Sequence, residues 1–196
     1  LSLYFLDLTG INSSLTKKVC SELELRCDSP DAYNADNSLP EDYIRKKIAE
    51  VHAKIPDAFI GMDVMVGFMG ETDEYFQKSY DFIHSLGVSF VHVFTYSERE
   101  NTDALKITPH IQESVRTARS VELHKLSEKM HQDFYKKFDG QIRPVLFETR
   151  NKSGYQVGFT DNYIKVAARL PFNAKNKIVP VRLEYKDGEI IGMLNE

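Results

Sequence analysis

Residues 58–68 read Ala-Phe-Ile-Gly-Met-Asp-Val-Met-Val-Gly-Phe, an almost continuous apolar run whose one charge is Asp63. Such a run is typical of a strand covered on both faces, as in a parallel sheet. A second run of this kind extends from Ser89 to Tyr96, and a shorter one occupies residues 3–8. These segments predict buried strands.

Helical patterns separate and follow the two longer runs. Apolar residues recur at helical spacing from Ile44 to Ile55, with Pro40 suited to the first helical position. A second helix is expected from Thr72 or Asp73, either of which can cap it, to Gly87. A third, from about Gln112 to Phe138, carries an apolar stripe formed by Leu123, Leu126, Met130, Phe134 and Phe138.

This alternation of helix and strand predicts an α/β fold built from βα units with a parallel sheet. Ligand-binding loops in that architecture follow the carboxyl ends of the strands, here residues 67–71 and 96–102. The polar stretch 28–37 is expected to be an exposed or disordered loop without an assigned role.

The C-terminal part has a different pattern. Short β-rich runs separated by turns occupy residues 141–148, 155–160, 163–168, 177–184 and 189–194. Lys186-Asp187-Gly188 predicts a hairpin turn between the last two. Five short strands in under sixty residues suggest a small closed barrel of a kind that often binds oligonucleotides.

Charge differs between the two parts of the chain, although the net charge is −4. Residues 1–138 carry 16 Lys and Arg against 22 Asp and Glu, whereas residues 139–196 carry 9 against 7. This small basic excess fits either a nucleic-acid partner or an ordinary solvated surface.

No apolar run is long enough for a membrane span and no signal segment is recognisable, so a cytoplasmic location is expected. Cys20 and Cys27 have neither a disulfide framework nor a metal-ligand spacing, and we expect ordinary thiols.

Several polar residues are candidates for a site. Asp63 in a buried strand needs a hydrogen-bond donor or a cation, which a ligand or a structural ion pair would supply equally well. The loop with Tyr96 and Arg99 would hold a carboxylate or phosphate, or is a plain surface loop. His92 is expected to be a satisfied core histidine. His124 and His131 are expected on the helix surface.

Two stretches, Ile60–Glu74 and His92–Arg99, resemble the radical S-adenosylmethionine methylthiotransferases in sequence, order and spacing. Gly158–Val166 with Lys177–Arg182 is similar to the TRAM domain of that family. The resemblance covers about residues 44–196 and is strongest to the MtaB-like branch, which modifies threonylcarbamoyladenosine. Met69 and Glu100-Asn101 stand where many members have proline and proline-glycine.

The resemblance implies insertion of a methylthio group at C2 of a modified adenosine beside the tRNA anticodon. Its cofactors would be S-adenosylmethionine and two 4Fe-4S clusters, one of them held by a C-x3-C-x2-C loop. Neither cluster loop occurs in this sequence, and the barrel segment between residues 12 and 40 is shortened or missing. We therefore expect a shortened, incompletely represented or degenerate homologue that is inactive by itself.

The resemblance also implies a domain division and site residues. Residues 1–138 would be a partial radical S-adenosylmethionine (βα) barrel ending in a long linking helix, and residues 139–196 a small all-β, OB-like TRAM barrel. The cofactor side would be lined by Gly61, Asp63, Gly67, Glu71, Tyr96 and Arg99. Phosphate contacts or stacking with tRNA would come from Arg143, Lys152, Tyr163, Lys165, Arg169, Lys177 and Arg182.

Three hypotheses remain open at this point. The chain belongs to a threonylcarbamoyladenosine methylthiotransferase; it is a non-catalytic tRNA- or RNA-binding fragment; or it belongs to a methylthiotransferase acting on isopentenyladenosine or a ribosomal protein. Residues 158–166 are the main feature against the last.

Overall fold

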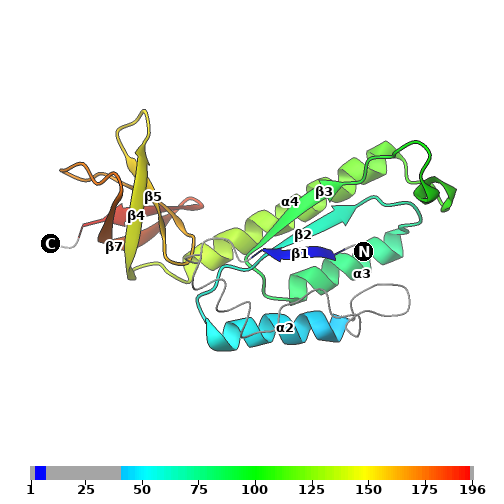
Figure 1. Ribbon diagram of the computed structural model, residues 1–196, viewed down its shortest axis with the longest axis horizontal. Coiled ribbons are helices and arrows are strands. Elements are labelled where there is room, and N and C mark those ends of the chain that lie inside the picture. The colour runs from blue at the N-terminus through cyan, green and yellow to red at the C-terminus, as the bar shows by residue number, and fades with distance from the viewer. Residues whose placement is uncertain (1–2, 8–40, 195–196) are drawn as a thin grey trace. The chain divides into compact units, whose positions relative to one another are not determined.

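The computed structural model describes residues 3–7 and 41–194 (Figure 1). The described residues divide into two compact units, one up to Met130 and the other from His131 onward. Helix α4, Glu113–Lys136, contributes residues to both. Each unit is described by itself.

The first unit contains a three-stranded sheet in the order β1-β2-β3. Its strands are β1 Leu3–Asp7, β2 Gly61–Val66 and β3 Phe90–Thr95. Strands β2 and β3 are parallel, as expected, with Gly61 opposite Phe90 and Val66 opposite Thr95. Strand β1 instead runs antiparallel to β2. Strand direction depends on the path of the connecting chain, which the composition of a short apolar run does not encode.

One face of this sheet is buried and the other is partly open. Met62, Val64 and Val91 are almost fully buried, whereas on the opposite face His92 is exposed and Phe94 is 52% exposed. The prediction of a β3 covered on both faces is therefore wrong, and so is the prediction of His92 as a core histidine. Since successive side chains alternate between faces, covering one face leaves every second residue of this edge strand accessible.

Three helices begin and end close to the predicted residues: α2 Glu41–Lys54, α3 Asp73–Ser85 and α4. The short 3-10 helix η2, Asp103–Lys106, was not predicted. Thr72, not Asp73, caps α3, because its side chain accepts a hydrogen bond from the Tyr75 amide.

Helix α4 packs against β3 through the stripe that the sequence predicted. Leu123 and Leu126 are buried, and between them and Met130 lies buried Ser127. The Ser127 hydroxyl accepts from the Val91 amide at 2.9 Å and donates to the Val91 carbonyl at 2.8 Å. Ser127 thereby satisfies two backbone groups of an edge strand that has no further strand beside it among the described residues.

The second unit contains a closed barrel with the strand order β4-β5-β6-β8-β7. Its strands are β4 Ile142–Arg150, β5 Gln156–Thr160, β6 Lys165–Ala168, β7 Lys177–Lys186 and β8 Glu189–Met193. All neighbours are antiparallel except β6 and β8, whose parallel pairing completes the circle. The five predicted strands are confirmed, and the barrel is compatible with a TRAM-like domain.

Two local features shape the barrel. Asp187 and Gly188 both have positive φ, 51° and 89°, as the predicted two-residue hairpin requires. Tyr163 also has positive φ, 66°, which delays the start of β6 until Lys165. No helix within the described ranges is long and apolar enough to cross a bilayer.

Candidate functional site

Two loops follow the carboxyl ends of the parallel strands β2 and β3. We call residues 67–72 the β2 loop and residues 96–102 the β3 loop. Gly67 and Gly70 have φ of 77° and 82°, a region that favours glycine, so the β2 loop turns sharply at both. The Glu71 carboxylate then folds back and accepts a hydrogen bond from the Gly67 amide at 2.8 Å.

Arg119 of α4 fixes the far end of the β2 loop. Its guanidinium donates to the Glu71 carboxylate and to the Glu71 carbonyl, both at 2.8 Å, and to the Asp73 carboxylate at 2.6 Å. The side chains of Arg119 and Glu71 are only 6% and 10% exposed, whereas that of Asp73 is 96% exposed. The Arg119–Glu71 pair is therefore the desolvated part of this network, and Asp73 is its solvated edge.

Arg116, one turn earlier on α4, contacts both loops. Its guanidinium forms an ion pair with Glu98 of the β3 loop and lies 5.6 Å from the ring centroid of Tyr96. Its aliphatic stem lies against Gly67, where an added Cβ would overlap Arg116 Cγ and come within 2.9 Å of Arg116 Cβ. Glycine at position 67 thus lets the backbone approach a buried arginine.

The aromatic side chains of the two loops meet directly. Tyr96 lies edge-on to Phe68, with ring centroids 4.8 Å apart. Asn101 of the β3 loop has φ of 61°, a conformation that asparagine tolerates better than most side chains. Asparagine thus accommodates the positive φ at this position of the β3 loop.

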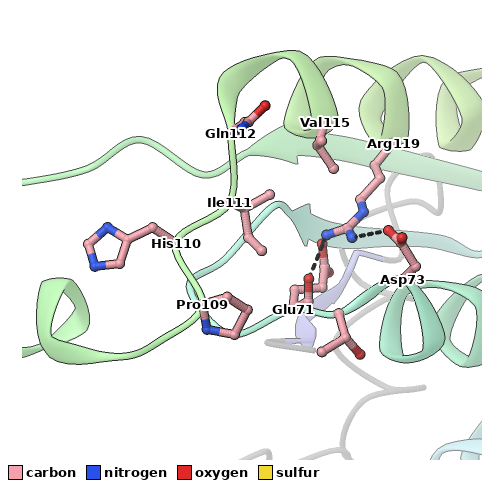
Figure 2. Close-up of a pocket in the computed structure, with 9 residues that line it drawn as sticks. Glu71, Asp73, Pro109, His110, Ile111, Gln112, Val115 and Arg119 are labelled. Atoms are coloured by element: carbon pink, nitrogen blue, oxygen red, sulfur yellow. Dashed lines mark hydrogen bonds and ion pairs between the residues drawn. The ribbon is translucent and has the colours of Figure 1, made fainter.

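A pocket of about 320 Å³ opens beside Arg119 (Figure 2). It is lined by Glu71, Thr72, Asp73, Pro109, His110, Ile111, Gln112, Val115 and Arg119. Figure 2 shows Glu71 and Asp73 converging on the Arg119 guanidinium at one side of it. Within the described residues, the Nε atoms of Arg116 and Arg119 are buried and have no hydrogen-bond acceptor.

The residues predicted for the cofactor side fall into two groups. Gly67, Glu71 and Tyr96 belong to the network held by the two arginines. Gly61 and Asp63 lie instead along the partly open face of β2, level with Phe90 and His92 of β3. Among residues 3–7 and 41–194, no side-chain hydrogen bond or ion pair engages the half-buried Asp63.

Arg99 is exposed on the β3 loop, where its carbonyl accepts a hydrogen bond from the Thr102 hydroxyl. It is not part of the network around Arg116 and Arg119. The described part of the chain brings together no three His, Cys, Asp or Glu side chains able to hold a metal ion. Cys20 and Cys27 lie outside the described residues, as does the predicted polar loop 28–37.

The arginines predicted for RNA contact on the barrel already have protein partners. Arg143 forms an ion pair with Asp161 at 3.0 Å and lies over the Phe138 ring. Arg169 lies over the Tyr155 ring, and Arg182 donates to the Gly140 carbonyl at 3.1 Å. Arg169 and Arg182 remain exposed to solvent, while Arg143 is half-buried.

The lysines at the predicted RNA surface are exposed: Lys152, Lys165 and Lys177. Tyr163 is 39% exposed and stacks on Phe159, with centroids 4.9 Å apart and planes 17° from parallel. Its ring thus offers one face of a two-ring stack next to Lys165, a combination able to bind a nucleobase and a phosphate.

Two titratable groups of α4 lie beside this stack. Tyr135 is buried, its hydroxyl accepts from the Lys165 amide at 3.0 Å, and burial raises its pKa. The His131 ring lies 4.2 Å from that of Tyr135, and burial lowers the pKa of His131. His131 is thus partly buried, which corrects its prediction as a surface residue; His124 is exposed as predicted.

Sequence reasoning did not identify Arg116 and Arg119. The sequence does contain a pattern for them. Successive members of the series Arg116, Arg119, Leu123 and Leu126 are three or four residues apart, so all four lie on one face of α4. Charged residues in a buried stripe are rare unless they are paired. That position marks them as candidates for buried ion pairs.

Comparison with known proteins identifies relatives, although no protein-family model matches the chain. Threonylcarbamoyladenosine tRNA methylthiotransferase MtaB of Bacillus subtilis is 27% identical over 79% of this chain and 36% of its own length. Ribosomal protein uS12 methylthiotransferase RimO of Alkaliphilus oremlandii is 30% identical over 77% of the chain and 36% of its own length. The tRNA-2-methylthio-N(6)-dimethylallyladenosine synthase of Thermodesulfovibrio yellowstonii is 31% identical over 78% of the chain and 32% of its own length.

The chain thus spans about a third of the length of these relatives. The three act on different substrates according to their names, so the likeness extends across the family and is not confined to one branch. The chain belongs to the radical S-adenosylmethionine methylthiotransferase family, a family of enzymes that includes the threonylcarbamoyladenosine branch.

Proposed function

We propose that this chain is part of an enzyme that adds a methylthio group to C2 of N6-threonylcarbamoyladenosine next to the tRNA anticodon. The observation that carries the proposal is the match to MtaB of Bacillus subtilis over 79% of the chain. In this proposal residues 1–138 are the later part of a radical S-adenosylmethionine barrel, and residues 139–196 are an RNA-binding TRAM barrel. The closed five-stranded barrel supports the second assignment.

The first unit offers features that suit S-adenosylmethionine. Asp63 presents a half-buried carboxylate on the partly open face of the sheet, where an amino or hydroxyl group of a ligand would neutralise or hydrogen-bond it. Phe94 and His92 provide ring surfaces on the same face. In the proposed assignment, Gly61 allows close approach of the ligand, Gly67 and Glu71 shape the adjoining loop, and Tyr96 and Arg99 border it.

The iron–sulfur clusters do not fit the described part of this chain, which groups no set of metal ligands. In the family, the cluster supplies the electron that cleaves S-adenosylmethionine to a radical. The activity is proposed for the gene product as a whole, with the cluster ligands supplied by sequence outside the given chain.

Anaerobic reconstitution tests the enzyme assignment. The gene product, including any residues encoded upstream of Leu1, is expected to bind iron and sulfide in the ratio of 4Fe-4S clusters. Nucleoside analysis of tRNA from cells lacking the gene then identifies the substrate, and loss of the methylthio group from threonylcarbamoyladenosine is expected. Loss from isopentenyladenosine, or loss confined to ribosomal protein, would transfer the assignment to the branches that the other two relatives represent.

Binding of tRNA tests the role of the barrel. Changing Lys165 and Arg182 together to alanine is expected to weaken binding and to reduce the slope of log Kobs against log salt by about 1.4 to 1.8, the loss of two phosphate contacts. A matched control changes the exposed Lys125 and Lys129 of α4 to alanine, which alters the net charge equally. If both double variants weaken tRNA binding equally, net charge explains the effect, and the proposal that the barrel surface binds tRNA is wrong.

A further inference from the structure

The two buried arginines of α4 have no role in the function proposed above. Replacing a buried ion pair with well-packed apolar side chains is often neutral or stabilising. Arg116 and Arg119 continue the stripe of Leu123, where apolar residues would pack without desolvating a charge. Each arginine also leaves a buried Nε without an acceptor among the described residues, which adds to the cost. Stability alone therefore does not explain these two residues.

Their contacts lie on the β2 and β3 loops. Arg119 binds both the carboxylate and the carbonyl of Glu71, and the same carboxylate accepts from the Gly67 amide. The two ends of the β2 loop are thus tied to one guanidinium. Two acceptors in different directions on the same residue, one of them a main-chain carbonyl, fix the loop more tightly than a point charge would.

Arg116 joins the two loops to each other. Its stem packs against Gly67 of the β2 loop, while its guanidinium reaches Glu98 and Tyr96 of the β3 loop. The edge-on contact of Tyr96 with Phe68 closes the connection from the other side. One helix face therefore contacts both loops at the edge of the sheet where ligands bind in βα architectures.

We propose that Arg116 and Arg119 are positioning residues, an arginine clamp that holds the β2 loop and the β3 loop in a fixed relation for a ligand bound at this edge of the sheet. This inference rests on the proposed function only in naming that ligand as S-adenosylmethionine. Neither arginine needs to touch the ligand. The clamp acts through Glu71, Gly67, Tyr96 and Glu98, and it exists whether or not the ligand assignment is correct.

Amide hydrogen exchange of the chain, measured loop by loop, tests the clamp. Arg116→Met keeps the stem and loses the guanidinium, so only the β3 loop should exchange faster, by about tenfold or more for the loss of a charge-assisted hydrogen bond. Arg116→Ala also removes the stem, so both loops should exchange faster. Exchange in residues 62–66 of β2 should stay as in the wild type.

Arg119 is tested by a paired change. The double variant Arg119→Met with Glu71→Gln avoids leaving a buried carboxylate unpaired, and it should speed exchange in the β2 loop while thermal stability stays close to that of the wild type. The matched control is Asp73→Asn, which removes only the solvated limb of the network and should leave both loops unchanged.

Two outcomes would overturn the clamp. One is an unchanged β2 loop in Arg116→Ala, and the other is an equal rise of exchange in residues 62–66, which would indicate ordinary loss of stability. Addition of S-adenosylmethionine to the full gene product gives a separate readout, with slower exchange expected in both loops of the wild type. If the wild type shows no protection, the ligand assignment is wrong, and the measurements without ligand still decide the clamp.

Discussion

Gly67→Ala tests the close approach of the β2 loop to helix α4. Alanine at a φ of 77° costs about 1–2 kcal/mol, because an L side chain is strained in the left-handed region. The new Cβ would also overlap the stem of Arg116, a residue that is 8% exposed and forms an ion pair with Glu98. Moving that stem off its rotamer and weakening the ion pair adds roughly 1–2 kcal/mol, since Glu98 is partly solvated. We expect the free energy of unfolding of the first unit to fall by roughly 3 kcal/mol in total.

Gly87→Ala is the matched control. Gly87 has a similar φ of 71°, but nothing lies within 4 Å of the position where its Cβ would be. It should therefore show the backbone strain alone, about 1–2 kcal/mol. Native-state hydrogen exchange of residues 62–66 reports the stability of the first unit for both variants.

The double variant Gly67→Ala with Arg116→Ala completes the cycle. Truncating Arg116 removes the overlapping Cγ but keeps the Cβ, 2.9 Å from the new methyl group, so the additional cost of Gly67→Ala should become smaller and approach the strain seen in Gly87→Ala. If Gly67→Ala costs no more than Gly87→Ala in the wild-type background, the packing of Arg116 on the β2 loop is refuted.

Three further changes test other parts of the molecule. Gly158→Ala should prevent normal closure of the barrel, because the new Cβ would lie 2.7 Å from a backbone Cα of β4. The expected result is a weaker β-sheet signal in circular dichroism. Thr72→Ala should lower the free energy of unfolding by about 1 kcal/mol in urea titration, through loss of the cap to the Tyr75 amide. Burial lowers the pKa of His131 below its ordinary 6.5, so stability present above that pH is lost as pH falls. His131→Gln should therefore flatten the fall in stability below about pH 6.5, measured by urea titration at several pH values.

Local pattern sufficed where the sequence had one strong periodicity. The apolar stripe of α4, the Thr72 cap region and the Asp187-Gly188 hairpin were all predicted close to their observed positions. These features depend on interactions between residues a few positions apart. The five strands of the barrel were found for the same reason, since each is bounded by turn residues.

The candidate site was predictable only in part. Gly67, Glu71 and Tyr96 were recognised because they stand at the ends of apolar runs, and the structure joins them in one network. Arg116 and Arg119 were missed, because their partners lie 18 to 48 residues away in the chain. The open face of β3 was missed because the composition of an apolar run does not state whether a neighbouring element covers it.

The sequence by itself determined the three long helices, the five barrel strands and the hairpin turn to within a few residues, and the motifs that place the chain among the methylthiotransferases. Tertiary structure alone decided the antiparallel direction of β1, the exposure of His92 and the choice of partners for the buried arginines. The physical reason is the distance along the chain between the residues that interact. Periodicity and capping involve residues within one helical turn or strand pleat, whereas strand direction, burial and long-range ion pairs depend on which distant segments the folded chain brings together.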